Sequence, residues 1–329
     1  MGTEIRGLRE SEMEAHAELV YLSYLEYADS KSGLADPQWW LKSARADPYY
    51  DPDVTRVLFL DGRMVASVTN FDRWVHVSDG RRARVSCIGS VCTHPDFRRR
   101  GLVRKLLAEC IQWMVAKGFH WSSLFGREEV YSGSGWTILT SFTATAELRA
   151  RDELSSGLTI RRADPEADAA TLTRLYERFN SGLTGPVVRN EAYWRQCVLV
   201  EQWGTVHPYY LLEANGEPVG YFCGEDGHLR EVAWVDRAQD VIACLLRRWE
   251  GQPVHFPLAT PELIELLRAV SHVRCAAEVQ GGITLSEAYK GLWRYIGPGG
   301  GEFPEICDTE SLKRFLRDRA YCFWSADSY

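Results

Sequence analysis

The chain has 329 residues, of which 45% are hydrophobic and 25% are charged, so it has the composition of an ordinary globular protein with room for about two domains. The net charge of −7 argues against general binding to nucleic acids or anionic membranes and weakly favours cationic substrates. Nine irregularly spaced cysteines without a C-x-x-C pair argue against a disulfide framework or a zinc site. Because the N-terminus is polar and no apolar run is long enough to cross a bilayer, we expect a cytoplasmic protein without a membrane segment or a bound metal.

The first half alternates helical and strand patterns. We predict strands at Glu4–Arg6, Thr55–Leu60, Met64–Val77, Arg84–Cys92, Trp121–Phe125 and Thr137–Leu148, and helices from Ser11 to about Ala28, at Pro37–Ala44 and from Leu102 to about Gly118. Ser11 and Glu14 have the spacing of a capping box, which would mark the start of the first helix. Asp61-Gly62 and Asp79-Gly80 are typical of hairpin turns, so the three central strands should form an antiparallel meander.

Residues Ser90–Arg104, SVCTHPDFRRRGLVR, join a strand to an amphipathic helix through three arginines and a glycine. A helix N-terminus has unpaired N–H groups and a partial positive charge, and a glycine lets the backbone come close to a ligand. The segment therefore predicts an anion site suited to a diphosphate, with a solvated basic loop as an equally good interpretation from the physics alone. The patterns G-x-x-x-x-G-K-[ST] and G-x-G-x-x-G are absent, so neither a P-loop NTPase nor a dinucleotide dehydrogenase is supported.

After a polar stretch the same order of elements begins again, which indicates an internal repeat. We predict a first domain at 1–150, a linker at 151–157 and a second domain at 158–329. In the second domain we expect strands at Leu158–Arg162, Tyr209–Glu213, Pro218–Cys223, Leu229–Val235 and Val254–Leu258, helices from Asp164 to about Asn180 and at Ala238–Trp249, Pro261–Ala269 and Thr309–Arg319, and a terminal strand at Tyr321–Tyr329. The second domain has no basic glycine loop before its helix.

The loop Arg98–Val103 resembles the R/Q-x-x-G-x-G/A loop of the GNAT acetyltransferase superfamily, and the H-P-x-[FY]-R pattern before it matches too. Val103 replaces the small residue of the family pattern, as is common in one subgroup. That subgroup resembles the enhanced-intracellular-survival acetyltransferases, which have tandem GNAT domains, and Thr184–Arg189 followed by Tyr193-Trp194 looks like their second domain. The resemblance covers roughly residues 1 to 295, and we expect the chain to lack the third, sterol-carrier-like domain of those relatives. It implies an α+β fold of two tandem GNAT-like domains, each a mixed, mostly antiparallel, twisted sheet flanked by helices.

The resemblance also implies which residues bind acetyl-CoA. The backbone of Val91, Cys92 and Thr93 would pair with pantetheine, Arg99, Arg100, Gly101, Leu102, Val103 and Arg104 would hold the pyrophosphate, and Gly126 and Arg127 would contact the cofactor near the next strand. Splayed strands after Thr93 and Trp121 would admit the thioester. Tyr131 lies in a segment similar to the family's Y-x-x-x-G-[FYW] and would be the general acid that protonates the departing CoA thiolate.

The general base is open. In the resembling subgroup the terminal carboxylate of an aromatic residue serves as the base, and this chain ends in Tyr329, but we expect the domain that delivers that terminus to be absent. The other candidates are Glu26, Asp72, Glu128, Glu129 and a chain of water molecules. His94 fits a structural role better than that of a base. Trp39, Trp40, Tyr24 and Phe71 would either line an amine pocket or belong to the core.

We therefore expect an acetyl-CoA-dependent N-acetyltransferase that moves acetyl to a primary amine by direct attack in a ternary complex. The first domain would be catalytic, and the second would be a degenerate copy that shapes the substrate cleft. The alternatives are a non-catalytic acyl-CoA-binding or sensor protein and a protein that binds nucleic acid or a partner through Arg98–Arg100. The sequence leaves open the acceptor (aminoglycoside, polyamine, amino acid or protein lysine) and whether identical chains associate into a homo-oligomer.

Overall fold

The structure is a computed structural model that describes residues 2–25, 36–147, 157–200, 206–272, 283–299 and 301–327. Its strands are β1 (Thr3–Gly7), β2 (Thr55–Leu60), β3 (Arg63–His76), β4 (Arg82–Thr93), β5 (Trp121–Leu124), β6 (Thr137–Glu147), β7 (Thr159–Arg162), β8 (Tyr209–Ala214), β9 (Glu217–Glu225), β10 (His228–Trp234), β11 (Pro253–Phe256) and β12 (Ile283–Tyr295). Its helices are α1 (Met13–Tyr24), α2 (Pro37–Ala46), α3 (Leu102–Ala116), α4 (Glu128–Tyr131), α5 (Ala169–Asn180), α6 (Glu191–Tyr193), α7 (Ala238–Arg248), α8 (Pro261–His272) and α9 (Thr309–Asp318).

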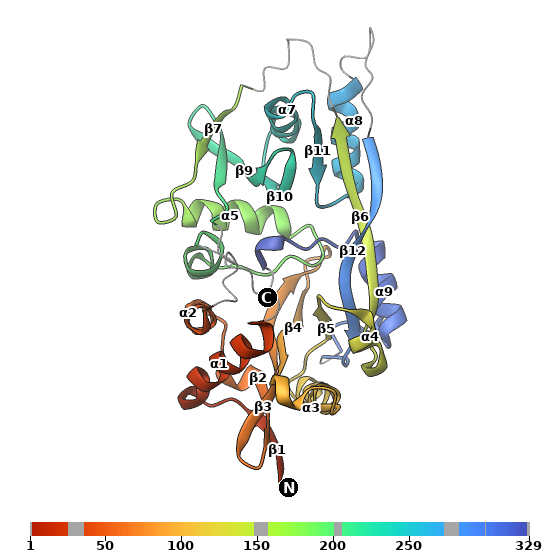
Figure 1. Cartoon of the computed structure of the whole chain (residues 1–329). Coiled ribbons are helices and arrows are strands. Elements are labelled where there is room, and N and C mark those ends of the chain that lie inside the picture. Colours follow the sequence, from red (N-terminus) through yellow and green to blue (C-terminus); the bar gives the residue numbers. More distant parts are fainter. Residues whose placement is uncertain are drawn as a thin grey trace.

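Within the described ranges the strands form one sheet, in the order β1-β2-β3-β4-β5-β12-β6-β11-β10-β9-β8-β7. Only the pairs β4–β5 and β10–β11 are parallel, which confirms the predicted mixed, mostly antiparallel α+β fold. The two halves exchange strands: β12 of the second half lies beside β5 of the first, and β6 of the first lies beside β11 of the second. The long strands β6 and β12 run side by side along one edge of the view in Figure 1 and connect the two halves.

The helices of the first half cover both faces of its strands. The alternation of side chains along β3 explains why: Ser67 points toward α1, where its hydroxyl lies 2.7 Å from His16 Nε2, and Asn70 points toward Cys110 of α3. The apolar stripe predicted for α3 is buried against β2–β4 through Leu102, Leu106, Leu107, Cys110 and Met114. This packing fixes the start of α3 at the end of β4.

The second half docks on an edge of β3 that β2 leaves free, since β2 pairs with β3 only as far as Thr69. There the N–H of His76 donates to Pro186 O, and the N–H of Val188 donates to Trp74 O at 2.7 Å. The segment around Pro186 therefore acts as a short extra strand on the first half's sheet, and the residues 71–77 of β3 lie where the halves meet.

Three element predictions are wrong in detail. The first helix is preceded by a 3₁₀ turn at Glu10–Glu12, and it is the Glu12 carboxylate that accepts the Arg9 N–H, so Ser11 and Glu14 form no capping box. Asp164 caps a turn, and α5 begins only at Ala169. The described part of the terminal segment, 321–327, forms no strand because the Cys322 N–H donates to Thr184 O rather than to a ladder.

The bounds of the two predicted domains stay a prediction, and the linker 151–157 lies outside the described residues except for Gly157. No helix in the described part of the chain is long and apolar enough to cross a membrane. The same residues bring together no group of three His, Cys, Asp or Glu side chains that could hold a metal ion.

His16 gives the fold a testable sensitivity to acid. Its ring is fully buried against Trp40, and burial lowers the pKa of His16 to about 3. Because the unfolded chain binds the proton near pH 6.5 and the folded chain does not, this group's contribution is complete above pH 6.5 and is lost as the pH falls toward 3. We expect His16 to lower the free energy of unfolding by about 2 kcal/mol between pH 6.5 and 5.

Urea unfolding at both pH values, on the wild type and on His16→Gln, measures this difference. The variant should show a smaller loss of stability on acidification, whereas replacing the exposed His228 with Gln should leave the wild-type dependence intact. An equal acid sensitivity of wild type and His16→Gln would mean that His16 is not the group responsible.

Candidate functional site

The basic loop leads into α3 with two residues in the left-handed region, Arg99 at φ 61° and Gly101 at φ 72°. Gly101 is the N-cap, and the first helical bond runs from the N–H of Lys105 to Gly101 O. The amides of Leu102, Val103 and Arg104 therefore belong to the helix turn whose N–H groups have no partner within the helix. A Cβ built on Gly101 would meet no atom within 4 Å, so no other side chain or backbone crowds this glycine at the start of α3. This geometry suits a phosphate group.

The three consecutive arginines have different surroundings. Arg98 donates to Ser23 O of α1 at 2.7 Å, which ties the loop to the first helix. Arg100 lies over the Phe97 ring and donates to Asp96 O, but its side chain is exposed. Neither Arg99, also exposed, nor Arg100 contacts a carboxylate among the described residues. Both guanidinium groups are thus available to an anion from solution.

The strands beside the loop separate as the resemblance implies, although earlier along the strand. β5 pairs with β4 only from Val85 to Ile88, with Leu124 as its last partner. Beyond Ile88, β4 continues to Thr93 without β5 at its side. The backbone of Val91, Cys92 and Thr93 therefore lies on the part of β4 that β5 does not pair with, and we call this gap in the strand pairing the opening between β4 and β5. It is the place predicted for pantetheine.

At the bottom of this opening β4 is irregular. Ser90 has φ 46°, and the register between β3 and β4 shifts at this point. Two of the four aromatic residues considered for an amine pocket hold the irregularity in place: Trp40 Nε1 donates to Ser90 Oγ at 3.1 Å, and Tyr24 Oη donates to Val91 O at 2.9 Å. They belong to the core under α1 and α2 and also shape the site.

Cys92 points away from the opening. Its thiol is buried, lies 2.9 Å from Ser67 Oγ, and has its pKa raised to about 11 by burial. The nucleophilic form of a cysteine is the thiolate, which burial disfavours. Its backbone remains beside the opening, but its side chain is not poised for attack.

Tyr131 ends the short helix α4, and its ring is buried in the apolar cluster that also contains Leu102 and Leu106 of α3. The ring packs directly on the backbone of Gly126, since a Cβ there would lie 2.6 Å from Tyr131 Cε2. The phenol makes no hydrogen bond with any residue that the structure describes, and burial raises the pKa of Tyr131 to about 12. It is therefore protonated at physiological pH and free to donate.

The other predicted residues lie in the turn before this tyrosine, beside the basic loop, or outside the described residues. Gly126 and Arg127 form the exposed turn between β5 and α4, with the Arg127 guanidinium 3.8 Å from Glu129. His94 has a structural role, because its Nδ1 accepts the Asp96 N–H and its Nε2 lies 2.7 Å from Arg63. Tyr329 and Glu26 fall outside the described residues, so their roles stay predictions.

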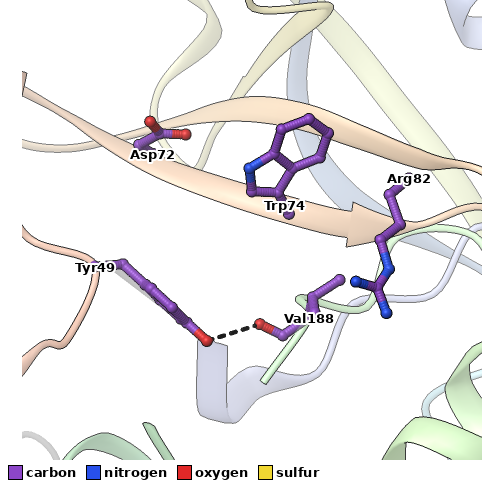
Figure 2. A pocket seen from close by; sticks show the side chains of 5 residues that line it. All are labelled: Tyr49, Asp72, Trp74, Arg82 and Val188. Carbon is purple, nitrogen blue, oxygen red and sulfur yellow. Dashed lines mark hydrogen bonds between the residues drawn. The ribbon is translucent and has the colours of Figure 1, made fainter. Parts of the chain in front are cut away.

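An open cavity of about 520 Å³ lies where the two halves meet. Figure 2 shows its lining residues, Tyr49, Asp72, Trp74, Arg82 and Val188, with the Tyr49 hydroxyl donating to Val188 O at 3.3 Å. The Trp74 ring is 46% exposed, whereas the charged residues are paired, Asp72 with Arg84 and Arg82 with Glu177. Asp72 was a candidate base, but both of its carboxylate oxygens already accept hydrogen bonds from the Arg84 guanidinium.

Two residues near Tyr131 have no counterpart among the sequence predictions. Tyr289 and Arg294 of β12 hydrogen-bond to the turn before α4 and the turn after it. They lie about half the chain away from Tyr131 in sequence, and their strand lay in a segment for which we predicted no element. The sequence contains no local signal for this contact.

Part of the chain matches a known family and curated relatives. Residues 4–139 match the family model described as an acetyltransferase (GNAT) domain. Two curated relatives from Streptomyces griseus, described as an uncharacterized N-acetyltransferase and as an uncharacterized N-acetyltransferase ORF5, are 28% identical to this chain over 192 residues. The alignment covers 51% of this chain and 44% of each relative, so the chain spans less than half the length of these relatives.

Solved structures with a similar fold cover most of the chain. A GCN5-related N-acetyltransferase from Anabaena variabilis has a TM-score of 0.65 at 14% identity, over 90% of this chain and 73% of that one. Eis1 from Mycobacterium abscessus has a TM-score of 0.60 at 17% identity, over 90% and 74%. A probable N-acyltransferase from Enterococcus faecalis has a TM-score of 0.66 at 12% identity, over 90% and 73%. At these identities the similarity concerns the fold, and it extends through both halves.

Proposed function

We propose that this chain, whose residues 4–139 match the model of an acetyltransferase (GNAT) domain, transfers an acetyl group from acetyl-CoA to a primary amine. The observation that carries the proposal is the basic start of α3, where the N-cap Gly101 has no neighbour within 4 Å of the position of a Cβ and the first-turn amides have no partner within the helix. Arg99, Arg100 and these amides would hold the pyrophosphate. The opening between β4 and β5 would take the pantetheine arm.

The chemistry would be a direct attack in a complex of both substrates. The amine nitrogen forms a bond to the thioester carbon, the carbon–sulfur bond breaks, and the sulfur leaves as a thiolate that Tyr131 protonates. The cysteine beside the opening supports direct attack rather than an acetyl-cysteine intermediate, because burial keeps Cys92 protonated. The proton lost by the amine would leave through Tyr329 or water, and the acceptor would be a small amine, with a cation favoured by the net charge of −7.

The test is a thermal shift with acetyl-CoA. At saturating ligand we expect the unfolding midpoint to rise by about 5 °C, since a ligand at a hundred times its Kd adds about 2.7 kcal/mol to the stability. Reversing Arg99 and Arg100 to Glu should weaken binding by at least about tenfold, because two attractive charges become repulsive ones. The matched control reverses two exposed arginines outside the first half, Arg162 and Arg317, and should retain the wild-type shift.

A thermal shift that is absent in the wild type would refute the acetyl-CoA site. A shift without thiol release from any amine in a broad panel would refute the transferase and support a non-catalytic acyl-CoA-binding protein. A shift that survives the Arg99→Glu, Arg100→Glu pair would place the ligand elsewhere.

A further inference from the structure

Strand β12 brings residues of the second half to the segment that carries Tyr131. Its residues Leu292–Tyr295 pair antiparallel with Leu124–Trp121 of β5, the strand that leads into that segment. Just before them the register of β12 against β6 shifts, between Tyr289 and Leu292. Gly291 makes the shift possible, because its φ is 96° and a Cβ would lie 2.6 Å from Leu124 O. Strand β12 therefore runs tightly along β5 (Figure 1).

Two side chains of β12 hold the Tyr131 segment, one on each side of the tyrosine. Tyr289 Oη donates to Gly126 O at 3.2 Å, five residues before Tyr131. Arg294 Nη1 donates to Ser134 O at 2.8 Å, three residues after it. The pair thus contacts both turns that flank α4.

Both contacts act on backbone that touches the tyrosine or its neighbours. The Gly126 backbone supports the Tyr131 ring, since a Cβ built on Gly126 would lie only 2.6 Å from Tyr131 Cε2. On the other side the guanidinium of Arg294 lies against Gly135, where a Cβ would be 1.8 Å from Nη1, and over the Trp136 ring at 5.5 Å. A shift of either turn would therefore move the phenol relative to the opening between β4 and β5.

Stability alone does not account for Arg294. The guanidinium is half-buried, burial lowers its pKa, and its Nε is buried without a hydrogen-bond partner. It has no carboxylate partner among the described residues. A half-buried cation without a counter-ion costs free energy, which a residue kept for packing would avoid by being apolar.

We propose that Tyr289 and Arg294 are positioning residues that fix Tyr131 for protonation of the leaving thiolate, so that the second half takes part in the reaction through strand β12. This inference rests on the proposed function, because it assumes that Tyr131 is the acid. Since small displacements of a catalytic group cost rate rather than substrate affinity, losing either contact should lower kcat and leave the KM for acetyl-CoA almost unchanged.

The test is a double-mutant cycle with Tyr131→Phe, followed by thiol release. Tyr289→Phe removes one hydroxyl and should lower kcat about threefold to tenfold, and Arg294→Met should lower it about tenfold or more. Arg294→Lys keeps a donor and should recover part of the loss. In the Tyr131→Phe background neither change should lower kcat further, because residues that act through one group are not additive. Leu285→Ala, at an exposed position of the same strand, should leave kcat at the wild-type value.

A full additional loss in the Tyr131→Phe background would overturn the positioning role and indicate a general effect on folding. An unchanged kcat in Tyr289→Phe, a conservative change at an exposed residue, would overturn it as well. If Tyr131→Phe alone kept the wild-type kcat, the acid assignment of the proposed function would fail and the positioning role with it. Absence of acetyl-CoA binding in the wild type would instead refute the function itself.

Discussion

Replacing Arg189 with Met is expected to destabilise the second half by about 3–5 kcal/mol, or to prevent soluble expression. The Arg189 side chain is fully buried, and its guanidinium donates to both oxygens of Glu231, at 2.9 and 3.0 Å, and to both oxygens of Asp327, each at 2.9 Å. Without the arginine, two carboxylates would remain buried without a counter-ion. Leaving a buried charge uncompensated is among the most damaging changes that a single substitution makes.

The charged groups of Arg189, Glu231 and Asp327 depend on one another and on the tyrosines around them. The hydroxyls of Tyr209 and Tyr221 donate to Glu231 at 3.0 and 2.6 Å, and the guanidinium lies 4.3 Å from the centre of the Tyr176 ring. Burial raises the pKa of Asp327 in spite of Arg189, as expected where one cation faces two carboxylates. The network joins the C-terminal segment to β10, so its loss should also release residues near the end of the chain.

Urea unfolding of Arg189→Met and of a matched arginine variant separates burial from pairing. Arg161 also binds two carboxylates, those of Asp168 and Glu213, but its side chain is 43% exposed and water can reach the pair, so Arg161→Met should cost clearly less than Arg189→Met. Adding Glu231→Gln and Asp327→Asn to Arg189→Met should recover part of the stability, because the uncompensated charges are gone. Similar losses for Arg189→Met and Arg161→Met, or no recovery in the triple variant, would contradict the electrostatic explanation.

The segment from β4 to α3 could be predicted from the sequence because its signals are local. A fifteen-residue helix follows a glycine and three arginines, and its apolar positions repeat with the helical period, so the helix and the loop were both found where the structure has them. The resemblance then assigned the loop to acetyl-CoA. The point at which β4 and β5 separate was predicted less exactly. The pairing of β5 with β4 ends at Leu124, and the other neighbour of β5 is β12, a strand that the sequence did not predict.

Strand β12 was missed because its pattern contains no period. Its residues 284–287 are all exposed and residues 290–293 are all buried, so buried and exposed positions do not alternate, and its partners β5 and β6 lie about half the chain away. The prediction of a terminal strand was wrong for the opposite reason. Tyr321, Cys322 and Trp324 are apolar and buried, as in a strand, but they fill the core between the halves without joining a sheet. Burial alone does not distinguish a strand from an irregular segment.

Replacing Tyr131 with Phe is expected to lower kcat about a hundredfold, with the KM for acetyl-CoA unchanged within about twofold, because only the proton donor is lost. The ring is 8% exposed and packs on apolar side chains, and its hydroxyl has no hydrogen-bond partner among the described residues, so Phe should fit without loss of stability. The pKa of about 12 also predicts that kcat of the wild type shows no fall from this group below roughly pH 10.

Thiol release is measured against pH, and a partly buried tyrosine, Tyr50, serves as the matched control. Burial also raises the pKa of Tyr50 to about 12, but its hydroxyl lies 3.0 Å from Thr55 Oγ1, away from the opening between β4 and β5. Tyr50→Phe should therefore lose about 1 kcal/mol of stability and keep its kcat, the reverse of the result expected for Tyr131→Phe. If both variants kept kcat while acetyl-CoA still bound, the protonation of the thiolate would have to come from water, and the burial of the Tyr131 ring would be a matter of packing alone.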